Sequence, residues 1–188
     1  MKLHLGCGKR FLPGFYHIDI EPFPHVDLVT SIDKLSSIES GTAEIIYSSH
    51  AFEYFSRGES HEVLAEWLRV LRPGGQLMLV VPNFRMLVEI YLETSDLSSI
   101  LGPLFGEWAN ESAGRIFHKM TWDNALLCSY LVEAGFENTH EFDPVEVLHK
   151  IDPSYDDYSL AFFPHMNRSG RQISLCIQAS KPILNSCC

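Results

Sequence analysis

Two glycines and an aspartate near the start of the chain have the types and spacing to bind a nucleoside. Gly6 and Gly8 flank Cys7 directly after the apolar segment that ends at Leu5, and Asp19 ends the next apolar segment. Glycines let a backbone approach a ligand closely, and an ionised carboxylate can accept hydrogen bonds from both hydroxyls of a ribose. The glycine pair alone would also suit a plain tight turn, but the following acid favours a binding site.

The same spacing argues against a dinucleotide. A Gly-x-Gly-x-x-Gly motif needs glycine at position 11, which is Phe11, and a helix N-terminus to hold the pyrophosphate. The run from Gly8 to Asp19 is too short for the usual crossover helix. The expected ligand therefore carries an adenosine without a pyrophosphate, which disfavours an NAD-dependent enzyme. Asp33, after the third apolar segment, could accept a hydrogen bond from the adenine amino group.

Two histidines are candidate general bases. His50 follows the fourth apolar segment, and His118 precedes a helix whose N-terminal cap is predicted at Thr121. An imidazole titrates near neutral pH, which suits removal of a proton from a hydroxyl. Glu53 could orient the His50 ring. The alternatives are that His50 caps the helix after the strand, that His118 satisfies a backbone carbonyl, and that Glu53 is a favourable acid in a first helical turn.

The elements that must position these residues read as an α/β pattern. Near-continuous apolar runs are typical of parallel strands covered on both faces. Such runs span residues 3–5, 16–20, 26–29, 44–48 and 76–81. Ser56 and Glu59 form a capping box before a helix that is predicted to end at Arg72-Pro73-Gly74-Gly75. Strand, helix and strand of these lengths make a βαβ unit.

The remainder of the chain alternates between regular and irregular segments. Helical spacing recurs within residues 86–93 and from Thr121 to a stop at Gly135, and residues 136–142 read as a strand. Residues 171–179 alternate apolar and polar side chains, as at an antiparallel edge. We therefore predict one domain over residues 1–188 with a Rossmann-like fold: a mostly parallel sheet, an antiparallel edge strand and helices on both faces. Irregular insertions at about 84–119 and 143–170 are expected to form the acceptor side.

Composition narrows the classes of partner. The chain has 188 residues, of which 46% are hydrophobic, and 14 basic against 24 acidic residues give a formal charge of −10. This balance argues against nucleic acid and membrane phosphates as partners. Five cysteines and nine histidines show no metal-ligand spacing, so we predict no metal and reduced thiols. The start of the chain lacks a signal peptide and no apolar run reaches about 18 residues, which predicts a cytoplasmic protein. The final Cys187-Cys188 pair is not a prenylation motif and is expected to lie in a frayed tail.

Several segments together resemble the class I S-adenosylmethionine-dependent methyltransferases. The series runs HLGCG, YHIDI, SIDKLSS, EIIYSSHAFEYF and VLAEWLRVLRPGGQLMLVVPNF, and it resumes with FHKMTWDNALLCSYLVEAGF and ISLCIQASKP. The likeness is dense over residues 2–83 and is greatest to the small methyltransferase type 11-like subgroup, in which a loop replaces the first helix. Two features depart from the pattern: the third glycine of the loop is missing, and a Leu-Pro-Phe element appears as Leu35-Ser36-Ser37.

The resemblance implies S-adenosylmethionine as the cofactor and a site at the ends of four strands. The residues carried over are Leu5, Gly6, Cys7, Gly8, Asp19, Ile20, Ile32, Asp33, Ser49 and His50. The glycine turn would line the methionine part of the cofactor. Asp19 would bind the ribose and Ile20 would pack against adenine.

On the same resemblance, Ile32 and Asp33 would contact the face and edge of the adenine. Ser49 and His50 would lie under the methionine carboxylate and amine or face the acceptor. The expected reaction is methyl transfer to a small molecule or sugar hydroxyl, with His50 as first and His118 as second candidate base. The alternatives are a catalytically silent S-adenosylmethionine-binding module that serves as a partner or regulatory subunit, and a protein methyltransferase. The sequence carries no indication of the oligomeric state.

Overall fold

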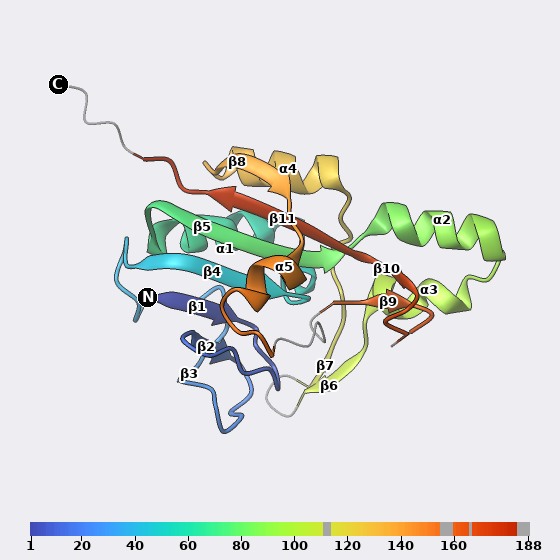
Figure 1. Cartoon of the computed structure of the whole chain (residues 1–188), viewed down its shortest axis with the longest axis horizontal. Coiled ribbons are helices and arrows are strands. Elements are labelled where there is room, and N and C mark those ends of the chain that lie inside the picture. Colours follow the sequence, from blue (N-terminus) through green and yellow to red (C-terminus); the bar gives the residue numbers. More distant parts are fainter. Residues whose placement is uncertain (111–113, 155–159, 166, 184–188) are drawn as a thin grey trace.

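A computed structural model of the chain describes residues 1–110, 114–154, 160–165 and 167–183 and shows one seven-stranded sheet (Figure 1). The strand order is β3-β2-β1-β4-β5-β11-β8. The strands are β1 (Lys2–Leu5), β2 (Tyr16–Asp19), β3 (Leu28–Val29), β4 (Ala43–Ser49), β5 (Leu71–Pro82), β8 (Glu137–Glu141) and β11 (Ser174–Ser180). The pairs from β3 to β5 are parallel, and β11 runs antiparallel to both of its neighbours. A mostly parallel sheet with an antiparallel strand is confirmed.

The predicted place of the antiparallel strand is wrong. We expected it at an edge, but β11 lies between β5 and β8, with Ile177 opposite Leu79 on one side and Glu141 on the other. Alternation of side chains reports which faces of a strand are covered, and it carries no information about which backbone edges are paired. The outermost strand on this side is β8.

Two helices cover one face of the sheet. Helix α1 (Arg57–Val70) begins with the predicted capping box, in which Ser56 Oγ accepts from the Glu59 amide and the Ser56 amide donates to Glu59 Oε2 at 2.6 Å. Helix α4 (Asn124–Glu133) packs beside it through a shared core that includes Trp67 and Leu131. The predicted cap at Thr121 is wrong, because Asp123 Oδ1 accepts from the amide of Leu126 at 2.8 Å.

The opposite face has a thinner cover. No helix lies between β1 and β2, as expected, and Leu12 and Phe15 of that connection pack over Tyr47 together with Leu148. Leu148 belongs to α5 (Pro144–His149), which lies in front of β4 and β5 in Figure 1. The first part of the 143–170 stretch is therefore helical and covers the sheet, where we had expected irregular chain. The helix replaces part of the cover that a crossover helix would supply.

The two predicted insertions meet beyond the end of β5. Residues 84–119 hold α2 (Phe84–Thr94), α3 (Ser98–Phe105) and a hairpin of β6 (Trp108–Asn110) and β7 (Gly114–Ile116). The other insertion contributes β9 (Phe162–Phe163), which pairs with β10 (Arg171–Gln172). Leu87 and Ile100 pack against Ile173 and Phe163, so both stretches gather on one side of the molecule (Figure 1). Their role as the acceptor side stays a prediction. No helix among the described residues is long and apolar enough to cross a bilayer.

Candidate functional site

The glycine turn after β1 has the geometry that its sequence predicts. Gly6 and Gly8 have φ values of +65° and +53°, a backbone region that residues other than glycine rarely adopt. A Cβ on Gly6 would lie 2.5 Å from the Cβ of Ala51, whereas a Cβ on Gly8 would meet nothing within 4 Å. Gly6 is thus required by close packing against the segment after β4, and Gly8 faces open space from which a ligand can approach the backbone.

Asp19 holds this turn and still has capacity for a ligand. Asp19 is 8% exposed and lies at the carboxyl end of β2. Its Oδ2 accepts from the Gly8 amide at 2.7 Å and its Oδ1 accepts from the Glu21 amide at 2.9 Å. A carboxylate oxygen has two lone pairs, so one remains on each oxygen for a pair of vicinal hydroxyls. An adenosine-containing cofactor therefore fits the acceptors that are present.

The candidate adenine contacts lie on the connection from β3 to β4. Ile32 is 6% exposed, and its carbonyl accepts a hydrogen bond from the indole N–H of Trp67 at 2.8 Å. A Cβ on Gly6 would lie 3.9 Å from Ile32 Cδ1. Asp33 accepts a hydrogen bond from the Ser31 hydroxyl. Ile32 thus belongs mainly to the core, and only a small part of it can reach a ligand.

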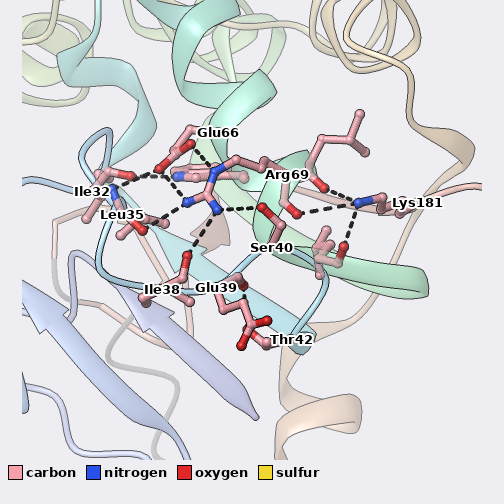
Figure 2. A network of polar contacts seen from close by, with 12 residues as sticks. Ile32, Leu35, Ile38, Glu39, Ser40, Thr42, Glu66, Arg69 and Lys181 are labelled. Carbon is pink, nitrogen blue, oxygen red and sulfur yellow. Dashed lines mark hydrogen bonds and ion pairs between the residues drawn. The ribbon is translucent and has the colours of Figure 1, made fainter.

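Helix α1 holds this helix-free connection through one arginine (Figure 2). The Arg69 guanidinium donates to the carbonyls of Leu35 at 2.9 Å and Ile38 at 3.0 Å, and to Ser40 Oγ at 2.9 Å. Glu66 binds the same guanidinium at 2.7 and 2.8 Å and accepts from the Leu35 amide at 3.1 Å. The hydrogen bond from Arg69 lowers the pKa of the Glu66 carboxyl, which keeps the pair charged.

A lysine from the far end of the chain completes the same network. Lys181 Nζ donates to the carbonyls of Leu68 and Leu71, both at 2.7 Å, at the end of α1 (Figure 2). These carbonyls lack partners within the helix, and a cation there also suits the helix dipole. The end of α1 that presents Arg69 is therefore fixed in place.

His50 lies where the sequence placed it, directly after β4, in an unusual backbone conformation. Its φ is +52°, and its amide donates to the Val80 carbonyl at 2.8 Å. Its ring Nε2 lies 2.9 Å from Ser174 Oγ, and its Nδ1 lies 3.3 Å from Glu53 Oε1. His50 does not cap the short helix η1 (Phe52–Tyr54), whose N-cap is Ala51.

His118 meets His50 at a shared carboxylate. Glu53 is fully buried, and its Oε1 lies 3.7 Å from His118 Nε2. The other ring nitrogen of His118 bonds the Pro103 carbonyl at 3.0 Å, so the predicted alternative of a carbonyl-bonded histidine holds for this nitrogen. Burial, and then the charge of Glu53, raise the pKa of the adjacent Tyr54 hydroxyl. Glu53 thus lies between His50, with which the sequence had paired it, and His118, which the sequence presented as a separate candidate.

Cys7 is not a reactive group. Burial, and then the charge of Asp19, raise the pKa of the Cys7 thiol to about 12. The thiol therefore remains protonated at neutral pH and is a poor nucleophile and metal ligand. Among the described residues, no three His, Cys, Asp or Glu side chains are placed to hold a metal ion.

Sequence reasoning missed two residues, Ser174 and Arg69. Ser174 was one of several polar residues in an alternating strand, and Arg69 was one charged residue on an amphipathic helix. No local pattern distinguishes either one, since both acquire partners more than 25 residues away. Ser49, at the end of β4, is half-buried. A surface hollow lined by residues such as Lys2 and Gln76 lies at the amino ends of the strands, opposite the candidate site.

A comparison with protein families finds one match. The family is described as a methyltransferase domain, and it matches residues 15–79, which include Asp19, Ile32 and His50. No functionally curated protein matches the sequence at a significant level.

Solved structures show the same fold at low identity. A methyltransferase of Thermotoga maritima, described as a possible histamine N-methyltransferase, has a TM-score of 0.55 and 11% identity over 88% of this chain and 72% of its own. The 1,6-didemethyltoxoflavin-N1-methyltransferase of Burkholderia thailandensis, with bound S-adenosylhomocysteine, has a TM-score of 0.52 and 14% identity over 96% and 70%. A Haloferax volcanii putative methyltransferase in complex with the activator Trm112 has a TM-score of 0.52 and 14% identity, and the match covers 96% of this chain and 81% of that chain.

Proposed function

We propose that this chain is a class I S-adenosylmethionine-dependent methyltransferase that methylates a hydroxyl of a small molecule or sugar, as the match to a methyltransferase domain and the shared fold support. S-adenosylmethionine supplies an electrophilic methyl group on its sulfonium, and transfer to a hydroxyl releases S-adenosylhomocysteine and a proton. The protein must therefore bind both molecules in line and take up that proton.

The proposed cofactor contacts follow from the turn after β1 and its neighbours. Asp19 would bind the ribose hydroxyls with its two free lone pairs, and the backbone at Gly8 would lie against the methionine part. Two observations support this placement. A Cβ on Gly8 would meet no atom within 4 Å, and Asp19 is nearly buried. Ile20 and the exposed part of Ile32 would contact the adenine.

His50 is the proposed general base. The single observation that carries the proposal is its position at the end of β4, beside the glycine turn. Ala51, the next residue, is the one that Gly6 packs against, so the backbone of His50 lies close to the proposed cofactor site, and its ring extends toward Ser174 at the start of β11. The contacts to Glu53 and Ser174 hold the ring in one orientation.

The net charge of the chain and its structural similarity to a small-molecule methyltransferase support a small acceptor. A formal charge of −10 disfavours nucleic acid. The Burkholderia relative binds 1,6-didemethyltoxoflavin, which is a small molecule. Exposed aromatic residues beyond the end of β5, Phe105, Trp108 and Phe117, could provide an apolar surface for an acceptor or its carrier.

Calorimetry and turnover test this function together. We expect S-adenosylhomocysteine to bind with one site per chain, and a panel of small alcohols and sugars to yield S-adenosylhomocysteine from S-adenosylmethionine. Lack of binding would contradict the proposed function. A crystal grown with S-adenosylhomocysteine would then show whether His50 faces the sulfur.

A second candidate is a cofactor-binding module that acts with a partner. The Haloferax relative forms a complex with an activator protein, and this chain exposes large apolar side chains on α2 and α3, including Leu92 and Leu97. Binding of S-adenosylhomocysteine without turnover across the acceptor panel, together with turnover of a protein acceptor or activation by a partner, would favour this candidate.

A further inference from the structure

The hydroxyl of Ser174 lies within hydrogen-bonding distance of the His50 ring. Its Oγ lies 2.9 Å from His50 Nε2 and accepts from the Ala161 amide at 2.8 Å. A serine hydroxyl has one proton to donate and two lone pairs. With one lone pair taken by Ala161, the proton can be donated to His50, and one lone pair remains for another hydroxyl.

Glu53 determines which nitrogen of His50 is the acceptor. Because an ionised carboxylate only accepts, the His50 Nδ1 that faces Glu53 at 3.3 Å must carry a proton. In a neutral ring the other nitrogen, Nε2, then has the lone pair. Ser174 therefore donates to His50 Nε2, and the proton on His50 Nδ1 faces Glu53 at ion-pair distance without a hydrogen bond of good geometry.

Glu53 itself is a buried carboxylate that ordinary folding does not explain. Among the described residues, neither of its oxygens accepts a hydrogen bond of good geometry, and its side chain is fully buried. Burial of such a group without partners is costly, so each case calls for an explanation. The compensation available is the pair of imidazoles of His50 and His118.

His118 is the second imidazole that faces Glu53. Its Nδ1 must donate to the carbonyl of Pro103, so a neutral ring would turn the lone pair of Nε2 toward the Glu53 carboxylate. A proton on His118 Nε2 removes that repulsion and leaves Glu53 ionised, as the relay requires. The titratable groups that face Glu53 are His50, His118 and the adjacent Tyr54.

We propose that Ser174, His50 and Glu53 form a proton relay, with Ser174 as the group that meets the acceptor hydroxyl and with Glu53 and His118 as positioning residues. The inference rests on the proposed function. As the acceptor oxygen is methylated, its proton passes to Ser174 Oγ, and the original Ser174 proton passes to His50 Nε2. The serine hydroxyl is regenerated, and His50 becomes an imidazolium beside Glu53.

The surroundings of Ser174 fit this role. It begins β11 opposite Pro82, at the end of β5 where the two insertions meet. Ser174 is 8% exposed and the His50 side chain is 24% exposed, whereas Glu53 is fully buried. The relay thus runs from the accessible side of the site into the core.

Imidazole ¹⁵N NMR tests the relay without a known acceptor. His50→Gln assigns the His50 signals in the full-length protein. We expect the proton on Nδ1 and a lone pair on Nε2, and we expect Ser174→Ala to shift the Nε2 resonance because its donor is lost. Ser180→Ala, the same change at the other end of β11, should leave the resonance unchanged. Either of two results would overturn the proposal: a proton on Nε2 in the neutral ring, or an Nε2 resonance that is unchanged in Ser174→Ala.

Kinetics and binding separate this inference from the proposed function. Calorimetry with S-adenosylhomocysteine should return the same affinity, within about threefold, for Ser174→Ala and wild type. If the acceptor panel yields turnover, Ser174→Ala should lower kcat by at least about tenfold, with recovery in Ser174→Thr, which keeps the hydroxyl. Failure of wild type to bind would defeat the proposed function, whereas full kcat in Ser174→Ala would defeat only the relay.

Discussion

At the scale of single residues, cofactor binding depends most on Asp19. Asp19→Ala removes the acceptors for a ribose and also releases the amides of Gly8 and Glu21. We expect the affinity for S-adenosylhomocysteine to fall by roughly 1–3 kcal/mol, or about 5- to 150-fold, as measured by calorimetry. Asp96→Ala, at an exposed carboxylate between α2 and α3, is the control. Unchanged affinity in a folded Asp19→Ala protein would remove Asp19 from the site.

His50 is expected to affect turnover and not binding. His50→Ala should leave the affinity for S-adenosylhomocysteine within about threefold of wild type and lower kcat by roughly 10²–10⁴-fold, as loss of a general base does. Because φ at this position is +52°, His50→Gly should have the same kinetic defect with a more stable fold. His61→Ala on the surface of α1 controls for loss of an imidazole elsewhere. Full turnover without His50 would rule it out as the base.

At the scale of elements, α1 substitutes for the helix that the β3–β4 connection lacks. Arg69→Leu removes the donors to the carbonyls of Leu35 and Ile38 and to Ser40 Oγ and leaves these acceptors without their charged partner. We expect a loss of at least roughly 2 kcal/mol in unfolding free energy by urea titration, together with weaker binding of S-adenosylhomocysteine.

The matched control for this prediction is Arg85→Leu. Arg85 makes an exposed pair with Glu89 on α2, and such pairs contribute little. If Arg69→Leu were destabilised yet bound S-adenosylhomocysteine as tightly as wild type, the connection would not depend on α1 for its binding geometry.

At the scale of the whole molecule, the two faces of the sheet differ in cover. The α1 face has two long helices, while the α5 face has one short helix and loops. His4 is buried on this thinner side, where its ring lies 5.1 Å from that of Tyr47 and 5.5 Å from that of His17. Burial, and then the charges of His17 and His25, lower the pKa of His4 from 6.5 to about 3.

This burial predicts a loss of stability in mild acid. Below pH 6.5 the unfolded chain protonates His4 while the folded chain does not, so the unfolding free energy falls as pH falls, until about pH 3. A single such group contributes about 1.4 kcal/mol per pH unit, hence about 2 kcal/mol between pH 7 and pH 5. Burial also lowers the pKa of His17, which acts in the same direction.

Urea titrations at pH 7 and pH 5 measure this effect. Between pH 7 and pH 5 the unfolding free energy of His4→Phe should fall by about 2 kcal/mol less than that of wild type. Replacement of the exposed His61 by Phe should leave the wild-type difference intact. Equal pH dependence in wild type and His4→Phe would show that His4 does not resist protonation in the folded state.

Local pattern was sufficient for much of the fold. The capping box at Ser56 and the stop at Gly135 depend on neighbours within a few residues, and both are confirmed. The glycine turn is confirmed as well, although Gly6 is fixed by packing against Ala51, which is distant in sequence. The cap at Thr121 failed because Asp123 stands two residues nearer to the helix and offers a better acceptor. The strand at residues 26–29 is shortened to Leu28–Val29.

The sequence by itself predicted a Rossmann-like fold, the class of cofactor and the residues that follow each central strand, because strand ends in a parallel sheet converge at one edge. Tertiary structure alone decided that β11 lies inside the sheet and that His118 approaches Glu53. It also decided that Ser174 contacts His50. These contacts join segments far apart in the chain, and no local periodicity or propensity records which distant segments will pair.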